Sequence, residues 1–287
     1  MVSSKVSESY TAIALETFFL NTVINKEDIF LFIDNDATNN FRNLKYPINI
    51  YENNNTPKSW ASNFNKGIKI ALGKKMDMVL ITNDIAFAKG WYDPLKILDN
   101  AITIPCCNIY VNYRTPNFRT NVLMNLSDYS GKEQDLDQCV YHHKLRFKLN
   151  EFCEKKFTQM YLARIPHIIL NKVGYFDETI SNCGGEDIDY IIRSALNGYK
   201  TLVAYNSYVI HFHGKSSWDG SETHEQANKR RDTYLKRCKE KWGDNLVDVF
   251  LSNKGKEKAY ELGFKHLYDE NKFYEIIRIL LKKNRSK

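Results

Sequence analysis

The chain lacks the cysteine spacings that build metal or redox sites. It has six cysteines among 287 residues, and no two of them form a C-x-x-C pair. That spacing is the usual signature of structural zinc sites and of thiol redox motifs. We therefore expect the cysteines to be free thiols in a reducing compartment, which argues against a small secreted domain held together by disulfides.

A long apolar run is also absent. Because no run of 18 or more apolar residues occurs, the sequence predicts no membrane-spanning helix. The first residues, MVSSKVSESYTAIALETFF, lack the charged start, apolar centre and small-residue cleavage site of a signal peptide. We expect a cytoplasmic protein, and peripheral contact with the cytoplasmic face of a membrane stays open.

A body-wide excess of positive charge is absent too. The net charge is +7, but residues 229–287 hold 17 Lys/Arg and 9 Asp/Glu, so the body before them is close to neutral. A near-neutral body argues against a broad nucleic-acid surface, and the basic end predicts a local anionic partner. We accordingly divide the chain into a domain at 1–228 and a basic helical extension at 229–287.

The chain does contain alternating helical and strand-like segments. IFLFID (29–34) and MVLI (78–81) are short continuous apolar runs, as in buried parallel strands, and an amphipathic pattern precedes each of them. This order is typical of an α/β fold. Asp34 and Asp84 follow the two runs, at the sheet edge where ligands bind in such folds. The helical apolar positions are Ala12, Leu15, Phe19 and Val23, then Ala61, Phe64, Ile68 and Ala71, with Gly73 as the expected end.

Three later segments have weaker patterns. Residues 125–158 are polar, so we expect an excursion or a mobile loop with a solvated His142-His143 pair. Residues 201–213 predict one or two strands with a turn near Asn206-Ser207. The end, FYEIIRILLKKNRSK, predicts an amphipathic basic helix that docks its apolar stripe either on the domain or on an anionic membrane surface.

Residues 174–200, GYFDETISNCGGEDIDYIIRSALNGYK, gather five carboxylates at the start of a predicted helix. Gly184-Gly185 permits a tight turn, so Glu186 and Asp187 occupy the cap and first turn, where free amides and the helix dipole stabilise carboxylates. Asp189 can pair with Arg193 one turn later. Capping is sufficient to explain such a cluster, but one of its acids could also serve as a general base.

Five stretches occur in a recognisable order: FIDNDAT, ASNFNKGIKIA, ITNDIAF, GYFDE followed by GEDID, and HFHGKS. Together they cover about residues 30–216. Their order resembles that of nucleotide-sugar-dependent glycosyltransferases of the GT-A fold related to family 2, of the rhamnosyl-, N-acetylhexosaminyl- or galactosyltransferase type. The match lies in the motifs and their spacing, and it points to a family.

The resemblance implies a Rossmann-like α/β fold, with a mainly parallel mixed sheet flanked by helices and a C-terminal helical extension. It implies inverting transfer of a sugar from a UDP-, GDP- or dTDP-linked donor to a hydroxyl of a glycan, lipid-linked or protein acceptor, with no nucleic-acid partner. The residues it assigns are Asp34, Asn65, Asn83 and Asp84 for the donor; Asp84 with His211 or His213 for Mn²⁺ or Mg²⁺; Asp187 as general base with Glu186 beside it; and Trp218 and Asp189 for the acceptor.

Two departures from the family pattern leave alternatives open. Only MVSSKVSE precedes the first helix, which shortens the first strand and its share of the nucleotide pocket. Thr82 replaces the first acid of the D-x-D motif, so metal dependence stays open, and Asp36 is either a compensating acid or a turn residue. The rival functions are a metal-dependent phosphodiesterase or nuclease, and a catalytically idle nucleotide- or carbohydrate-binding module.

Overall fold

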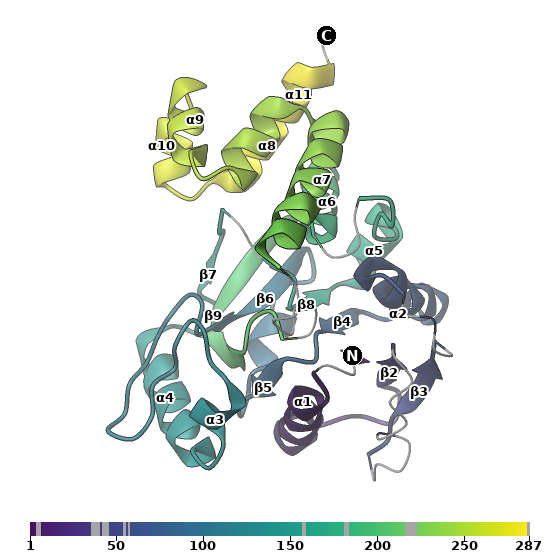
Figure 1. The fold of residues 1–287 in the computed structure, drawn as a ribbon, viewed down its shortest axis with the longest axis vertical. Coiled ribbons are helices and arrows are strands. Elements are labelled where there is room, and N and C mark those ends of the chain that lie inside the picture. Colours follow the sequence, from purple (N-terminus) through teal and green to yellow (C-terminus); the bar gives the residue numbers. More distant parts are fainter. Residues whose placement is uncertain are drawn as a thin grey trace.

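The computed structural model describes residues 1–3, 7–35, 41, 46–53, 56, 58–156, 159–180, 184–215 and 223–285. The chain folds into an α/β body with a group of C-terminal helices beside it (Figure 1). Within the described ranges, no helix combines the length and the apolar character needed to cross a membrane.

The N-terminal strands form a small parallel sheet. Its order is β1 (Val2–Ser3), β2 (Leu31–Asp34) and β3 (Asn49–Glu52), and both ladders are parallel. A parallel bridge from Val2 to Thr82 joins it to the larger sheet. The IFLFID run therefore forms the buried parallel strand that its composition predicts, although β1 has only two residues.

The larger sheet is mixed, and its strands follow the order β4-β8-β6-β9-β5. β6 and β9 are parallel, whereas β4 with β8, β6 with β8 and β5 with β9 are antiparallel. The strands are β4 (Met78–Ile81), β5 (Ile85–Phe87), β6 (Ala101–Cys107), β8 (Leu162–Ile165) and β9 (Lys200–His211), with β7 (Phe152–Cys153) paired to β9. The segment predicted as one or two strands is thus one strand, and the expected turn is a register shift between Ala204 and Tyr208.

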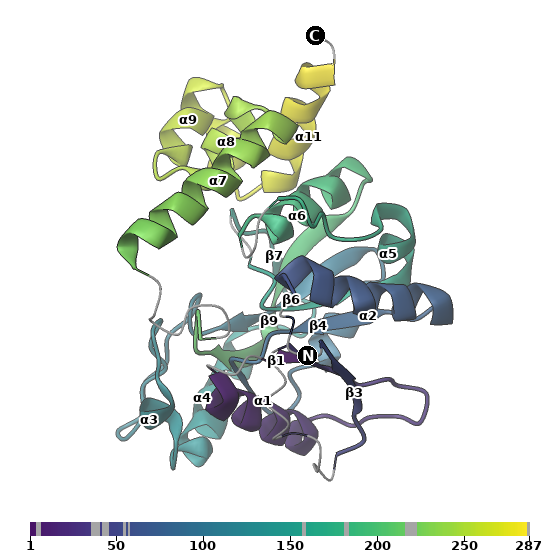
Figure 2. The same cartoon turned by 45° about the vertical axis from the view of Figure 1, so that its right-hand side comes forward.

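Helices cover both faces of these sheets (Figure 2). They include α1 (Glu8–Asn21), α2 (Trp60–Lys74), the short η2 (Asp93–Lys96), α5 (His167–Val173) and α6 (Glu186–Leu196). α2 buries the predicted face, and it ends at Lys74 with Lys75 in the left-handed region, one residue after the expected Gly73.

The predicted apolar face of α1 is confirmed for Leu15, which is buried, and Phe19, which packs against the core, but it is wrong for the other two positions. Ala12 is exposed and Val23 is 87% exposed, while Thr11, Ala14, Leu15, Thr17 and Phe18 are buried. The threonines can be buried because their hydroxyls donate to carbonyls of the same helix, Thr11 to Ser7 and Thr17 to Ile13. Burying a hydroxyl costs little free energy when its hydrogen bond is made, so a prediction from hydrophobicity alone did not include these threonines in the buried face.

The described part of this segment, residues 125–156, holds two helices and a strand, which corrects the alternative of a mobile loop. These are α3 (Leu126–Tyr129), α4 (Glu133–Arg146) and β7. His142 is exposed as predicted, but His143 is fully buried, with Tyr113 Oη 2.7 Å from its Nδ1 and the Tyr205 carbonyl at its Nε2. Burial lowers the pKa of His143 to about 4. It is a neutral core histidine because α4 turns it towards β9.

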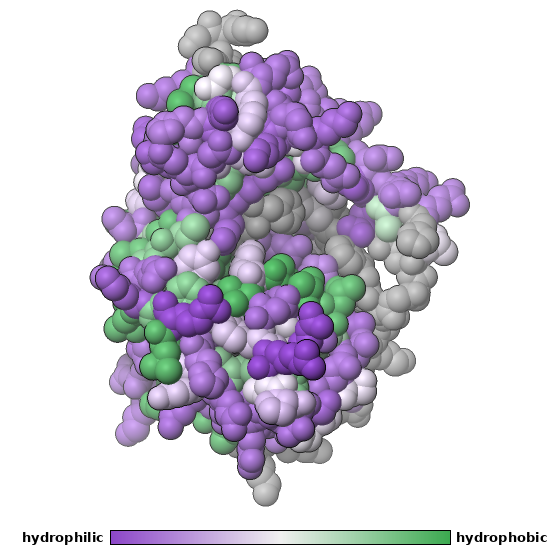
Figure 3. All heavy atoms as spheres, turned by 90° about the vertical axis from the view of Figure 1, so that its left-hand side faces the viewer, coloured by the Kyte–Doolittle hydropathy of each residue, from purple (hydrophilic) through white to green (hydrophobic). Residues whose placement is uncertain are grey.

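The C-terminal helices pack on α6. They are α7 (His224–Trp242), α8 (Asp244–Leu251), α9 (Gly255–Glu261), α10 (Lys265–Asp269) and α11 (Phe273–Arg285), so the predicted boundary at 228/229 falls inside α7. The apolar stripe of α11 is buried in a core cluster with Ile188 and Ile192 of α6: Phe273, Ile276, Ile277 and Leu280. That stripe therefore docks on the protein and is not available to a membrane. The outer surface of these helices is largely hydrophilic (Figure 3).

Candidate active site

A cavity of about 270 Å³ opens where the ends of β4 and β9 meet the start of α6 and one side of α7. It collects residues from six separate parts of the chain. Its polar side chains and glycines are Thr82, Asp84, Gln159, Gly184, Gly185, Glu186, Asp187, His211, His213, Gly214 and Arg230, and aromatic rings come from Trp60, Tyr161 and Tyr234. Three of the five sequence motifs, ITNDIAF, GEDID and HFHGKS, therefore contribute residues to one cavity, whereas FIDNDAT and ASNFNKGIKIA do not line it.

Asp84 is a buried, ionised carboxylate at one wall of this cavity. The Thr82 hydroxyl lies 2.8 Å from its Oδ1, and the backbone N–H of Lys215 donates to its Oδ2 over 3.1 Å. His211 Nε2 lies 3.5 Å from Oδ2. Burial opposes ionisation, but the imidazole and these hydrogen bonds outweigh it and lower the pKa of Asp84 to about 2. Asp84 thus carries its charge at any physiological pH.

The residues around Asp84 partly fit a divalent cation. His211 stacks on Tyr161, with ring centroids 4.4 Å apart, and its buried Nδ1 has no hydrogen-bond partner among the residues that the structure describes. His213 lines the same cavity, with its backbone in the left-handed region at φ 57°. Carboxylate and imidazole are ordinary ligands of Mn²⁺. Over the described residues, however, no group of three or more such side chains converges.

The two adjacent acids at the start of α6 differ in their surroundings. Glu186 is 3% exposed, and its carboxylate accepts from the N–H of Gly184 in the preceding turn over 2.6 Å. Asp187 is partly exposed in the cavity, and it accepts from the N–H of Ile188 over 2.8 Å and of Met160 over 3.4 Å. Burial and the charge of Glu186 raise the pKa of Asp187 to about 6. A carboxyl that titrates near neutrality is suited to take up a proton.

The double glycine before α6 allows α7 to pack against the turn. Gly184 and Gly185 have φ of 157° and 90°, so Gly185 occupies a conformation that other residues rarely adopt. A Cβ at Gly185 would lie 3.1 Å from Ile180 and 3.2 Å from the Tyr234 ring. The predicted tight turn is present, and its small residues also make room for Tyr234.

Asp34 lies at the same sheet edge as Asp84, as the strand pattern predicts. Asp34 is 3% exposed at the end of β2, opposite Ser3, and the neighbouring Val2 bridges to Thr82. Two strand spacings separate β2 from β4, which is about 10 Å. Asp34 does not itself line the cavity.

Three predicted site residues have structural contacts instead. Asn65 exchanges hydrogen bonds with the backbone of Phe176 and donates to Glu178 over 2.8 Å, so it ties α2 to the GYFDE loop. Asn83 is fully buried and donates to the hydroxyls of Ser7 and Thr11, so it anchors α1. Both amides are used in packing contacts and neither residue lines the cavity, so the structure does not bring them to the predicted donor site.

Asp189, the third of these, is fully buried and therefore cannot contact an acceptor. Its oxygens lie 2.8 Å from Arg193 Nε, 2.8 Å from Lys241 Nζ and 3.0 Å from Trp242 Nε1. The predicted pair with Arg193 is confirmed, and two donors from α7 join it. Trp218 and Asp36 lie outside the described residues.

Sequence reasoning did not identify Tyr161, Arg230 and Tyr234 as cavity residues. The basic run Lys229-Arg230-Arg231 was a signal for Arg230, but it was assigned to the extension as a whole. Tyr161 had no signal, because a tyrosine at the start of a strand is ordinary core composition.

Comparison with known proteins supports the fold. No protein-family model matches the chain, and no curated protein matches it in sequence. The crystal structure of GalNAc-T7 with UDP, GalNAc and Mn²⁺ superimposes with a TM-score of 0.55 and 15% identity, over 94% of this chain and 52% of that chain. This chain thus spans about half the length of that protein. At this identity the likeness shows a shared GT-A fold, as the sequence predicts.

A second solved structure aligns more weakly. The mannosyltransferase PcManGT from Pyrobaculum calidifontis, in complex with GDP-Man and Mn²⁺, has a TM-score of 0.49 and 9% identity, over 99% of this chain and 74% of that chain.

Proposed function

We propose that this chain is a glycosyltransferase that moves a sugar from a nucleotide-diphosphate sugar to an acceptor hydroxyl with inversion. The observation that carries the proposal is the cavity itself. It places Asp187, whose pKa is about 6, across from the ionised Asp84 and its imidazole neighbour, within a GT-A fold. The UDP and Mn²⁺ in the GalNAc-T7 structure support a nucleotide-sugar donor.

The proposed reaction is a direct displacement. The carboxylate of Asp187 takes the proton of the acceptor hydroxyl as its oxygen bonds to the anomeric carbon. The bond from that carbon to the diphosphate oxygen breaks at the same time, and the electron pair leaves with the nucleoside diphosphate. Attack from the face opposite the leaving group inverts the anomeric carbon.

The leaving diphosphate needs positive charge beside it. Asp84, with His211 or His213, would hold a divalent cation, which when bound neutralises charge on the phosphate oxygens. Thr82 leaves one acid fewer than a D-x-D motif supplies, but its hydroxyl holds Asp84 in place. His213 is half-buried and lines the same cavity, so either imidazole is in reach of a cation held there.

Donor binding is expected to depend on metal and on Asp84. Thermal stabilisation by UDP, GDP and dTDP, with Mn²⁺ or with a chelator, measures it. We expect one of these nucleotides with Mn²⁺ to raise the unfolding temperature, and Asp84→Asn to remove most of that rise. Stabilisation by single-stranded oligonucleotides in place of any nucleoside diphosphate would contradict the proposal and favour a nuclease. Equal stabilisation with chelator would make the site metal-independent.

Arg230 supplies a further positive charge to the cavity from α7. Its Nη1 lies 3.5 Å from the place of a Cβ on Gly184, which sets it beside the acid-bearing turn. A guanidinium is well suited to phosphate oxygens because it offers paired N–H donors. We propose that Arg230 contacts the donor diphosphate.

Arg230→Gln is therefore expected to weaken binding of the stabilising nucleoside diphosphate. A hydrogen bond to a charged group contributes about 1.5–3 kcal/mol, so the Kd should rise by about 10–100-fold. Calorimetric titration measures the Kd. Arg231→Gln is the matched control, because Arg231 is exposed and does not line the cavity. Equal losses in both variants would indicate a general charge effect and not a contact.

A further inference from the structure

The imidazole of His211 lacks the hydrogen bond that usually orients a histidine ligand. A histidine that binds a cation through one ring nitrogen normally donates from the other nitrogen to a carbonyl or carboxylate, and that bond fixes the plane of the ring. In this chain Nε2 lies 3.5 Å from Asp84 Oδ2, whereas the buried Nδ1 has no hydrogen-bond partner among the described residues. A different contact therefore has to hold the ring.

The main chain of His211 is held separately from its ring. Its N–H donates to Asn108 Oδ1 over 2.8 Å, and its carbonyl accepts from Asn108 Nδ2 over 3.0 Å. Asn108 is fully buried, so this reciprocal pair fixes the backbone at the end of β9. Neither bond reaches the imidazole, so rotation about the side-chain bonds is not restricted by Asn108.

Tyr161 packs its ring flat against the imidazole. The ring centroids are 4.4 Å apart and the two planes differ by 17°. The phenol is fixed at its far edge, because Tyr161 Oη donates to the carbonyl of Pro105 in β6 over 2.6 Å. Tyr161 is also 3% exposed, so the surrounding core holds it. A ring that is anchored in this way presents a fixed flat surface, and stacking on it restricts the plane of the imidazole.

The main chain of Tyr161 supports the other side of Asp84. Its carbonyl accepts from the N–H of Thr82 over 2.8 Å, and the Thr82 hydroxyl lies 3.0 Å from the same carbonyl. That hydroxyl is 2.8 Å from Asp84 Oδ1. Tyr161 thus contacts His211 through its ring and Thr82 through its backbone, and these two residues lie on either side of the Asp84 carboxylate.

We propose that Tyr161 is a positioning residue of the candidate active site, which holds the imidazole of His211 in the plane that faces Asp84. The stacked ring takes the place of a hydrogen bond at Nδ1. The inference rests on the proposed function, because a fixed imidazole matters there for holding a divalent cation beside the donor diphosphate. Tyr161 acts through His211.

The experiment compares Tyr161→Leu with Tyr161→Phe. Leucine removes the stack, whereas phenylalanine keeps the ring and loses only the bond to Pro105. Calorimetric titration with UDP, GDP and dTDP, each in excess Mn²⁺ and in chelator, measures the affinity that the metal adds. We expect Tyr161→Leu to reduce that gain by about 10–100-fold, the usual effect of losing a group that orients a metal ligand, and to leave the affinity in chelator unchanged. Tyr161→Phe should keep most of the gain.

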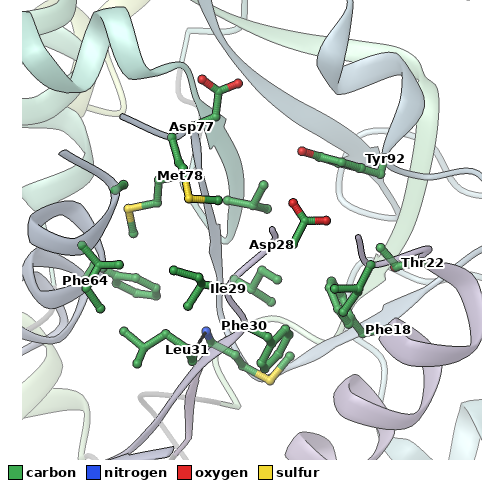
Figure 4. Close-up of a pocket in the computed structure, with 18 of the residues that line it drawn as sticks. Phe18, Thr22, Asp28, Ile29, Phe30, Leu31, Phe64, Asp77, Met78 and Tyr92 are labelled. Carbon is green, nitrogen blue, oxygen red and sulfur yellow. Dashed lines mark hydrogen bonds between the residues drawn. The ribbon is translucent and has the colours of Figure 1, made fainter. Parts of the chain in front are cut away.

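Phe30→Leu controls for the loss of packing. Phe30 borders a separate apolar cavity of about 180 Å³ between β2 and β4 (Figure 4), and it does not line the candidate active site. Phe30 and Tyr161 are 7% and 3% exposed, so each leucine variant removes a buried aromatic ring and both should lower the midpoint of thermal unfolding. Only Tyr161→Leu should change the affinity gained from Mn²⁺.

Proton NMR tests the stack without any ligand. The ring protons of His211 can be assigned by their loss in His211→Gln. A phenol stacked on the imidazole shifts these protons upfield, so we expect the shift in the parent protein and in Tyr161→Phe, and its loss in Tyr161→Leu.

Two results would overturn the inference. Equal ring-proton shifts of His211 in the parent protein and in Tyr161→Leu would show that the stack does not hold the imidazole. Equal losses of the Mn²⁺ gain in Tyr161→Leu and Phe30→Leu would show an effect of packing alone. Absence of Mn²⁺-dependent binding of all three nucleotides by the parent protein would instead contradict the proposed cation site, and the NMR comparison would still decide whether Tyr161 orients His211.

Discussion

Asp187→Asn is expected to reduce turnover by about 10²–10⁴-fold, which is the usual contribution of a positioned general base. Asparagine keeps the size of the side chain, and its oxygen can still accept from the N–H of Ile188. It cannot take up the proton of the acceptor hydroxyl. Initial rates of sugar transfer with the stabilising donor measure the loss, and the donor Kd should stay within a few-fold of the parent value.

The pH profile gives this prediction a second readout. Because the pKa of Asp187 is about 6, turnover of the parent protein should rise with pH up to about 6–7 and then level off, and that step should be missing in Asp187→Asn. The folding stability depends on pH in the opposite direction. The pKa is raised from its ordinary 3.8, so the stability contribution of Asp187 is present below about pH 4 and lost as the pH rises through 6.

Asp187→Asn should therefore be more stable than the parent at pH 7.5, by up to about 3 kcal/mol at 1.36 kcal/mol per pKa unit.

Glu186→Gln is the matched control. Glu186 is buried and bonded to the turn, so its replacement should cost less turnover and more acceptor affinity. An active Asp187→Asn with an inactive Glu186→Gln would reverse the two roles, and near-normal turnover in both would refute base catalysis at this turn.

Asp189→Asn is expected to destabilise the protein by about 3 kcal/mol, because the half-buried Arg193 loses its counter-charge, whereas Lys241 keeps its ion pair with Asp177. Asp189 has no exposed surface, and Arg193, Lys241 and Trp242 all contact its two oxygens. The contacts from Lys241 and Trp242 join the end of α7 to α6. Urea unfolding at pH 7.5 measures the change in the free energy of unfolding.

Asp232→Asn is the control for this prediction, since Asp232 is exposed on α7 and its loss should change stability by less than about 0.5 kcal/mol. Donor affinity should also fall in Asp189→Asn, because α7 carries Arg230 and Tyr234 into the cavity. Equal stability of the two variants would show that the buried carboxylate does not anchor α7.

The sequence by itself determined the elements that local patterns encode. IFLFID and MVLI became β2 and β4, and the face of α2 was predicted residue by residue. The double glycine and the acids after it gave the turn and start of α6 correctly. These features depend on periodicity, on backbone freedom and on helix capping, which act over a few residues and can be read without knowing the fold.

Only the tertiary structure decided which polar residues serve the cavity and which serve the core. Asn65, Asn83 and Asp189 have the same chemistry as site residues, but partners far along the chain use their amides and carboxylate for packing. His143 is buried for the same kind of reason. The sequence left open whether the apolar stripe of α11 docks on the domain or on a membrane. In the structure, α6 and α8 cover this stripe. Hydrogen-bond satisfaction and burial of one face against another are long-range properties, so no local pattern contains them.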